Sequence, residues 1–455
     1  MLIRGLSGFC RAGRKKTGRN RSRKLAAGTN MAPVSALSAD MDTMGGKIMQ
    51  EQQYPLSGIR VVELGTHVAV PCATRFLADW GADVIKVENL SGDQWRVVGR
   101  NQMCPVLDEE NPFFDLQNAN KKFVALNLKS AMGLSALMRL LEDADIFVSN
   151  MRLPALRKLN VDYETLKERF PRLIYGHFTG YGYEGPDAEK PGFDSVAFWA
   201  RSGAMTDWGV KDAFPIMPPT GAGDMMAGSI LCCGLLAALQ GRSATGHGCF
   251  VSNSLLGSAV WYNSAGVVST QYGNTFPKEA GRPANPLGYQ YQCADGEWVM
   301  IGVADYNGVY PQVCDALGLE KYKEDPRFCR IDQVKLHVDA FVAILREAFS
   351  KLSRDEAIAA LSRHNIVCGK IAHMRDLWSD PQVLANGYVR PVNFQNGHSA
   401  LYPEVPVRFE GYAAKTGAPA KPVGADTREV LESVGYTALE IERGAADGSL
   451  KGAQP

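Results

Sequence analysis

Hydrophobic and polar positions along residues 57–180 alternate in the manner of an α/β fold. The run 59-IRVVEL-64 is β-branched and uninterrupted, as in a parallel strand buried on both faces. The stretch 72–81 has helical spacing and 82–88 is a second apolar run, so the three predict a βαβ unit. The alternation continues with strands at 122–128, 145–150 and 172–180 and helices at 130–144 and 162–170. The pattern predicts an α/β fold with a doubly wound open sheet.

The second half of the chain carries further elements and one interruption. A helix at about 224–240 and a strand at 248–254 precede a helical stretch that ends near Tyr272. Residues 273–288 are rich in Gly and Pro and indicate a linker. The segments beyond it predict a smaller α+β unit and a return to β-structure: strands at 289–293 and 297–303, helices at 307–318, 334–351 and 354–363, a β-rich stretch at 399–411 and a helix at 426–435.

Composition excludes several classes of protein. The 455 residues have a net charge of +1, 45% hydrophobic and 21% charged residues, so nothing indicates binding to nucleic acid or a membrane surface. The ten cysteines include no C-x-x-C pair and read as reduced thiols of a cytoplasmic protein, without a zinc site or disulfides. No apolar stretch, including 229-SILCCGLLAALQ-240, is judged long enough to cross a membrane.

The first 53 residues differ from the rest. Residues 1–30 contain no acid but many Arg and Lys residues, as in an organellar transit peptide. A disordered basic tail or translation from a start codon upstream of the true one would look the same. We favour the last two interpretations and expect the folded protein to begin near Tyr54.

The segment 216-IMPPTGAGDMMAGSILCCGLLAAL-239 places a single carboxylate, Asp224, before a long apolar run. Its simplest role is that of a helix N-cap. A dinucleotide-binding loop is a poor fit, because Gly221 and Gly223 are followed by Gly228 rather than by the G-x-G-x-x-G spacing. The third possibility is an ionised nucleophile for an activated acyl group, with the small neighbours Gly223 and Gly228 admitting a bulky substrate.

Five blocks of sequence favour the third possibility. The chain resembles the class III CoA-transferase family of the CaiB/BaiF type, and the blocks that carry the resemblance follow one another in the order of the family. They are residues 57–88, 118–130, 145–159, 179–203 and 220–228. The similarity extends from about Leu56 to Ile441. It implies that Asp224 is the catalytic aspartate, which takes CoA from an acyl-CoA through an aspartyl-CoA thioester and passes it to a carboxylic acid. Coenzyme A is then a co-substrate, and no metal, ATP or redox cofactor is implied.

The family also contains alpha-methylacyl-CoA racemases, which carry a proton-transferring histidine in a GHD motif. This chain has 192-GFD-194, and Phe193 cannot transfer a proton, so a transferase is favoured over a racemase. A non-catalytic CoA-binding protein is a third alternative. Asp194 is interpreted either as a capping carboxylate or as a support of the site.

The resemblance also implies residues that bind CoA or substrate. They follow the first, third and fourth predicted strands or lie nearby: His67, Val68, Ala69, Leu126, Lys129, Asn150 and Lys158. Val68 stands where the oxalate enzymes of the family have a glutamine, which disfavours oxalate. The blocks around 118–130 and 191–203 look most like the branch of phenyllactate and 2-hydroxyisocaproate CoA-transferases of amino-acid fermentation. The implied donor is an enoyl-CoA such as cinnamoyl-CoA or isocaprenoyl-CoA and the acceptor an (R)-2-hydroxy acid; carnitine-like and bile-acid-like acceptors stay open.

The resemblance finally implies a domain plan and partners. Residues 54–272 and 381–445 would form a large Rossmann-like domain, linked by 273–288 to a small domain at 289–380, with 446–455 as a tail. An interlocked homodimer is implied, and association with a dehydratase is a further possibility.

Overall fold

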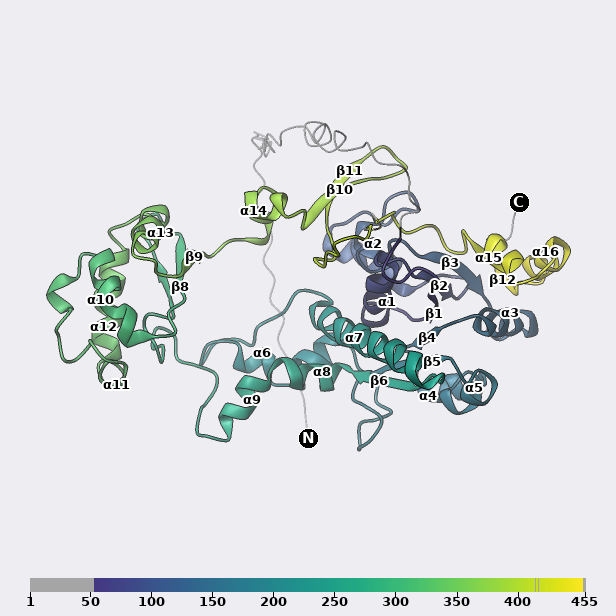
Figure 1. Ribbon diagram of the computed structural model, residues 1–455, viewed down its shortest axis with the longest axis horizontal. Coiled ribbons are helices and arrows are strands. Elements are labelled where there is room, and N and C mark those ends of the chain that lie inside the picture. The colour runs from purple at the N-terminus through teal and green to yellow at the C-terminus, as the bar shows by residue number, and fades with distance from the viewer. Residues whose placement is uncertain (1–52, 414, 416, 453–455) are drawn as a thin grey trace, which may run out of the picture. The chain divides into compact units, whose positions relative to one another are not determined.

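The computed structural model describes residues 53–413, 415 and 417–452, so most of the basic N-terminal segment lies outside the described residues. A seven-stranded sheet with the order β12-β3-β2-β1-β4-β5-β6 organises the larger part of the chain (Figure 1). Its strands are β1 (Arg60–Leu64), β2 (Asp83–Glu88), β3 (Lys122–Leu126), β4 (Ile146–Ser149), β5 (Ile174–Thr179), β6 (Phe250–Ser254) and β12 (Leu450–Lys451). All neighbours pair in parallel except β12, which is antiparallel to β3. The predicted α/β fold with a doubly wound sheet is confirmed.

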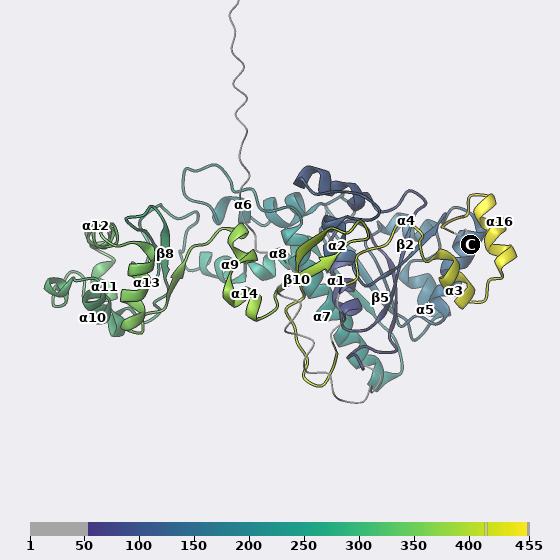
Figure 2. The same cartoon turned by 90° about the horizontal axis from the view of Figure 1, so that it is seen from above.

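Helices cover both faces of this sheet because the buried strands are apolar on both faces. One face packs Val61, Val84 and Ile174 against α1, α7 and α8. The other packs Val62, Val124 and their neighbours against α3, α5, α15 and α16. The label η marks a 3₁₀-helix (η3) or a π-helix (η4) in this region. The helices are α1 (Ala69–Asp79), η3 (Gln94–Gln102), α2 (Pro112–Asn118), α3 (Ala131–Glu142), α4 (Leu153–Lys158), α5 (Tyr163–Arg169), η4 (Asp194–Ala200), α6 (Ala204–Asp207), α7 (Ala222–Thr245), α8 (Leu255–Tyr262), α9 (Ser264–Thr270), α15 (Thr427–Ser433) and α16 (Ala438–Ala446). In the view turned by 90°, the strands lie between α7 and the group of α3 and α16 (Figure 2).

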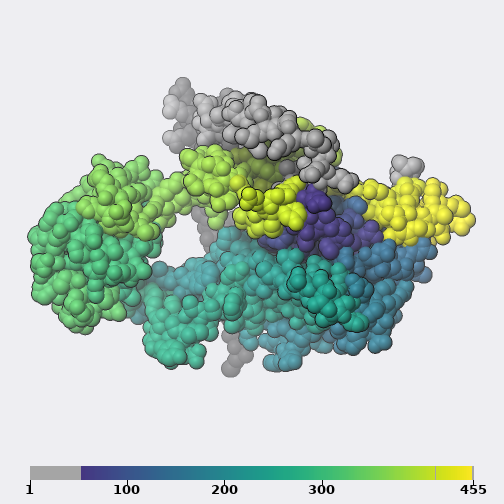
Figure 3. All heavy atoms as spheres, in the orientation of Figure 1, coloured from purple at the N-terminus to yellow at the C-terminus, as the bar shows by residue number. Residues whose placement is uncertain are grey.

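The C-terminal segment corrects one prediction. Residues 446–455 were expected to form a tail, but β12 pairs Leu450 with Leu126 and extends the central sheet. The strand is only two residues long, which gives no periodic signal in the sequence. Figure 3 shows the C-terminal atoms (yellow) packed directly on atoms of the first half of the chain (blue). Both ends of the folded chain therefore contribute to one core.

Helix α7 corrects a second prediction. It has 24 residues, and an 18-residue window reaches a mean hydropathy of 1.7, so by length and composition it is long and apolar enough to cross a membrane. The apolar run read from the sequence was shorter because Gly and Ser residues interrupt it. In the fold α7 packs on α1, β5 and β6, and the core helix of a globular protein meets the same criterion.

Residues 287–370 build a core of their own. The antiparallel sheet β7-β8-β9 packs on four helices, and Leu287, which was expected in the linker, is fully buried here. The elements are β7 (Gln290–Gln292), β8 (Trp298–Ile301), α10 (Tyr306–Ala316), η5 (Glu320–Tyr322), α11 (Ile331–Val334), α12 (Val338–Phe349), α13 (Arg354–Arg363) and β9 (Cys368–Lys370). The predicted smaller α+β unit is thus confirmed. The chain continues through η6 (Met374–Trp378), α14 (Pro381–Ala385) and the hairpin of β10 (Val389–Asn393) and β11 (Ser399–Pro403).

Candidate active site

The strand order of the sheet reverses between β1 and β4. From β1 the chain proceeds outward to β2 and β3, and from β4 it proceeds the other way to β5 and β6. In open α/β sheets ligands bind at the carboxyl ends of the strands at such a point. Asn150 ties the two strand ends together: the Thr66 amide donates to its Oδ1 at 3.0 Å, and its Nδ2 donates to the Thr66 carbonyl at 2.8 Å.

A cavity of about 550 Å³ lies at this position. The loops after β1, β4 and β5 and the start of α7 line it, which brings together residues from four distant parts of the sequence. Among its lining residues are five that the resemblance implied: His67, Val68, Ala69, Asn150 and Asp224. Its size is typical of a site for a small organic ligand.

Asp224 is not the N-cap of α7. The cap position is Gly221, whose φ of 78° suits glycine, and Asp224 is the third residue of the helix. Among the described residues, none donates a hydrogen bond to the carboxyl oxygens of Asp224. Asp224 instead lines the cavity and is partly buried.

The surroundings of the Asp224 carboxyl group oppose its ionisation. Burial raises the pKa of the Asp224 carboxyl to about 8, and the Asp194 carboxylate adds to this rise. A helix N-terminus alone would favour the charged form. Desolvation and then the like charge of Asp194 oppose it here, and among the described residues no cation pairs with the group to offset them.

Asp194 lies in the first turn of η4. Burial raises the pKa of its carboxyl to about 6, although the Gly221 and Gly223 amides and the Trp199 indole nearby favour the ionised form. None of these donors has good hydrogen-bond geometry toward Oδ1 of Asp194, which is buried without a partner, as is Nε1 of Trp199. The two carboxyl groups, Asp194 and Asp224, are called the carboxyl pair below.

The glycines of α7 serve packing rather than substrate access. A Cβ at Gly223 would overlap Oδ1 of Asp194 and lie 2.6 Å from Cγ of Phe198. A Cβ at Gly228 would lie 2.5 Å from the carbonyl oxygen of Ala69. Both glycines therefore let α7 approach η4 and α1 closely, which corrects the expectation that they admit a bulky substrate.

The wall beside Asp224 is aromatic. The rings of His67 and Phe193 are 5.4 Å apart, and Phe193 keeps 62% of its surface exposed. His67 has a left-handed backbone with φ of 62°. Val68 and Ala69 line the cavity but are almost entirely buried in the core beneath it.

Four predicted site residues do not line this cavity, and Asp194 is one of them. Leu126 is buried in the core at the end of β3, whereas Lys129 and Lys158 are exposed. Their binding roles stay predictions. Arg157, one position before Lys158 on α4, lines the cavity instead, because one residue turns a helix by about 100°.

Several lining residues were missed in the sequence. Arg152, Arg157 and Lys190 supply positive charge to the cavity. Arg152 lies two residues after the end of the predicted strand 145–150, a signal that would have found it. His177 also lines the cavity; its Nε2 donates to the Met151 carbonyl at 2.7 Å, so its Nδ1 accepts from the Tyr183 hydroxyl.

Residues 56–427 match the sequence profile of CoA-transferase family III. The chain belongs to this family.

Curated relatives agree with the family assignment. The chain is 39% identical over 386 residues to the (R)-2-hydroxy-4-methylpentanoate CoA-transferase of Clostridioides difficile, covering 85% of this chain and 97% of that protein. It is 34% identical over 398 residues to the cinnamoyl-CoA:phenyllactate CoA-transferase of Clostridium sporogenes, covering 87% and 97%. A solved structure of a CaiB/BaiF family protein from Brucella suis superimposes with a TM-score of 0.73 at 26% identity, covering 84% of this chain and all of that one.

The predicted family and the predicted branch of relatives are thereby confirmed. The family III transferase is an enzyme with an α/β fold whose relatives are 2-hydroxy acid CoA-transferases.

Proposed function

We propose that this family III transferase moves CoA from an acyl-CoA to a carboxylic acid, with Asp224 as the nucleophile. The observation that carries the proposal is the position of Asp224: it lines a cavity at the switch point of the sheet, and no described residue forms an ion pair with it. Burial raises the pKa of Asp224 and leaves its ionised form poorly solvated, which makes that form reactive toward a thioester.

The proposed reaction proceeds through two mixed anhydrides. An oxygen of ionised Asp224 attacks the thioester carbonyl carbon, the C–S bond breaks, and CoA leaves as a thiolate. The thiolate attacks the Asp224 carbonyl carbon of the anhydride, which releases the donor acid as a carboxylate and leaves an aspartyl-CoA thioester. The acceptor carboxylate then attacks this thioester, and the expelled thiolate attacks the acceptor carbonyl to form the new acyl-CoA and restore Asp224. No net proton or electron is consumed.

This scheme asks the protein mainly for positioning. One thioester replaces another, so the overall free-energy change is small, and correct placement of the reacting groups can supply about 7–11 kcal/mol. Coenzyme A is a co-substrate in the proposal, and no metal or redox cofactor is required. Arg152 and Arg157 are cations of the cavity that suit the phosphate groups of CoA, whereas Lys190 already pairs with Asp187.

For the substrates, we propose an enoyl-CoA donor such as cinnamoyl-CoA or isocaprenoyl-CoA and an (R)-2-hydroxy acid acceptor. The two relatives named above support this choice by their own substrates. The apolar lining residues Phe193, Met151 and Leu255 suit an aromatic or branched acyl group. Phe193 also argues against racemisation, because its ring cannot accept the alpha proton. A dehydratase that consumes the 2-hydroxyacyl-CoA would complete a step of amino-acid fermentation.

We further propose a cytoplasmic homodimer. Large apolar side chains are strongly exposed on and around α8 and α9, among them Trp261 at 71%, Tyr272 at 85% and Phe214 at 94%. Such exposure indicates a surface that another chain covers. The nine cysteines among the described residues are free, which suits a reducing compartment. Sedimentation equilibrium tests the dimer, and a monomer at micromolar concentration would contradict it.

The nucleophile is tested by intact-protein mass spectrometry after incubation with cinnamoyl-CoA or isocaprenoyl-CoA. We expect wild type to carry a CoA adduct that hydroxylamine removes, and Asp224→Ala to carry none and to lose at least about 10³-fold in transfer rate. The matched control is Asp339→Ala, which removes an aspartate from the first turn of α12. Absence of an adduct on wild type with a wider panel of acyl-CoA esters would refute the proposal.

A further inference from the structure

A set of six charged side chains lies directly beneath the loop that carries His67. The acids are Glu63, Glu88 and Asp93, and the bases are Lys86, Arg96 and Lys121, so that the set, called the compensated cluster below, has equal numbers of each sign. The side chains of Glu63, Lys86, Asp93 and Lys121 are completely inaccessible to solvent. Buried charges are tolerated only when they are paired in this way.

Lys86 is the centre of the compensated cluster. Its ammonium group donates to Glu63 at 2.7 Å and to the Gly65 carbonyl at 2.9 Å. Its Nζ also lies 3.0 Å from Oδ2 of Asp93, an ion pair without the alignment of a hydrogen bond. Burial alone would lower the pKa of Lys86, but Glu63, Asp93 and Glu88 hold it above the ordinary lysine value.

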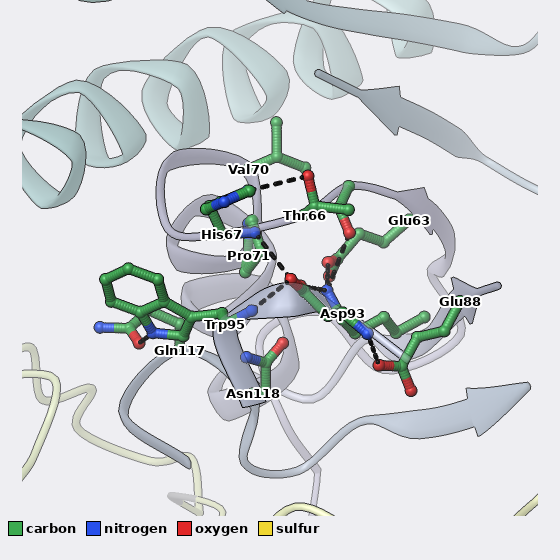
Figure 4. A network of polar contacts seen from close by, with 12 residues as sticks. Glu63, Thr66, His67, Val70, Pro71, Glu88, Asp93, Trp95, Gln117 and Asn118 are labelled. Carbon is green, nitrogen blue, oxygen red and sulfur yellow. Dashed lines mark hydrogen bonds and ion pairs between the residues drawn. The ribbon is translucent and has the colours of Figure 1, made fainter. Parts of the chain in front are cut away.

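Asp93 connects the compensated cluster to the cavity. Its Oδ1 accepts from the His67 amide at 3.1 Å and from the Trp95 amide at 2.9 Å, while its own amide donates to Glu88 at 2.9 Å. Figure 4 shows Asp93 under the loop, with Thr66 and His67 on one side and Glu63 and Glu88 on the other. Asp93 itself does not line the cavity.

The contact of Asp93 with His67 falls on a strained position. His67 has φ of 62°, a left-handed conformation that is unfavourable for a residue with a Cβ atom. A strained residue persists only where its surroundings hold it, and the amide of His67 is held by a carboxylate that is itself fixed by Lys86. The left-handed turn directs the imidazole toward Phe193 and the cavity.

We propose that Asp93 is a positioning residue of the active site, which holds the His67 backbone in its left-handed conformation and so fixes the aromatic wall of the cavity. Asp93 acts through His67 and does not touch the reacting atoms. The kinetic test of this inference rests on the proposed function. Crystal structures of the variant test the positioning role separately from that function.

The test uses the full-length chain with Asp93→Ala, Asp93→Asn and the control Asp426→Asn. Asp426 is matched to Asp93: it is buried to a similar extent, its Oδ2 accepts from the Phe123 amide at 2.8 Å, and it pairs with Lys421. Asp426 does not line the cavity. If Asp93 only stabilised the fold, all three variants would change the KM and the thermal midpoint in the same way.

We expect Asp93→Ala to raise the KM for the acyl-CoA by about tenfold or more and to change kcat by less than about threefold. Asp93→Asn keeps an oxygen acceptor for the His67 amide and should raise KM by only about two- to threefold. Asp426→Asn should lower the thermal midpoint without changing KM. Kinetics are measured below the midpoint of the least stable variant.

A second comparison uses His67→Gly. Glycine adopts a φ of 62° without strain and carries no ring, so Asp93→Ala should add less than a twofold change in KM when His67 is already glycine. An equal effect of Asp93→Ala in both backgrounds would overturn the proposal, as would an unchanged KM in Asp93→Ala or an equal rise in Asp426→Asn.

Crystal structures of wild type and Asp93→Ala give the readout that is independent of catalysis. We expect the variant to lose the left-handed conformation of residue 67 and the contact between its imidazole and Phe193. Retention of both would overturn the positioning role even if the enzyme transfers CoA. If His67 is displaced in the Asp93→Ala crystal structure and wild type forms no CoA adduct, the first result would support the positioning role and the second would refute the proposed function.

Discussion

The compensated cluster and the carboxyl pair are two groups of charged side chains withdrawn from solvent to different extents, and they differ in pairing. In the first, burial alone would raise the pKa of Glu63, but Lys121 and Lys86 lower it to about 2. In the second, burial raises the pKa of Asp224 to about 8 and Asp194 adds to the rise. Desolvation raises the pKa in both groups, and only the paired lysines of the first group reverse this effect. Pairing makes the first group a scaffold, and its absence leaves the second group reactive.

The largest expected effect comes from breaking the pairing of the compensated cluster. Lys86→Met leaves Asp93 and one oxygen of Glu63 buried without their cation, so the free energy of unfolding should fall by about 3–5 kcal/mol. Urea denaturation measures this change. The control is Lys122→Met, since Lys122 pairs with Asp83 at a site where both side chains are more than one-third exposed, and it should cost at most about 1 kcal/mol. Equal losses in the two variants would contradict the scaffold role.

A smaller effect, of opposite sign, is expected in the carboxyl pair. The pKa of Asp224 is raised in the folded state, so the folded protein holds this proton up to about pH 8 while the unfolded chain releases it near its ordinary pKa of 3.8. Wild type should therefore lose stability as the pH rises from about 4 to 8. Asp224→Asn should become more stable than wild type across this range, by about 1–2 kcal/mol at pH 8.5.

Thermal unfolding of wild type and Asp224→Asn at pH 5 and pH 8.5 measures this difference. The control Asp339→Asn changes an exposed aspartate that pairs with Arg282 at the surface, and its difference from wild type should not grow with pH. If the difference in stability between Asp224→Asn and wild type were the same at both pH values, burial would not govern the ionisation of Asp224.

The smallest effect concerns the second member of the carboxyl pair. Asp194→Asn removes the like charge beside Asp224 and should lower the pKa on the acid side of the profile of kcat/KM against pH by about 0.5–1 unit. Asp207→Asn, a change of an exposed aspartate on α6, should leave the profile unchanged. An unmoved profile in Asp194→Asn would show that the two carboxyl groups titrate independently.

The sequence predicted the parts of the structure that depend on local periodicity. The six parallel strands and the helices after them follow from apolar runs and amphipathic stretches, and the catalytic candidate Asp224 follows from its block of resemblance. The two-residue strand β12 has no periodic signal, and the length of α7 is hidden by Gly and Ser residues in its apolar run. Arg157 was missed in favour of Lys158 because the direction of a side chain on a short helix depends on what the helix packs against.

By itself the sequence determined the α/β class, the family and the residue that is the candidate nucleophile, because these depend on patterns read along the chain. Only the tertiary structure decided the charge state of that residue. The pKa of Asp224 depends on Asp194 and on burial at the switch point of the sheet, and both arise from segments far apart in sequence. The backbone conformation of His67 also depends on the tertiary structure. Its amide donates to Asp93, which lies 26 positions further along the chain. Electrostatic interactions act through space, so chemistry at this site exists only once the chain has folded.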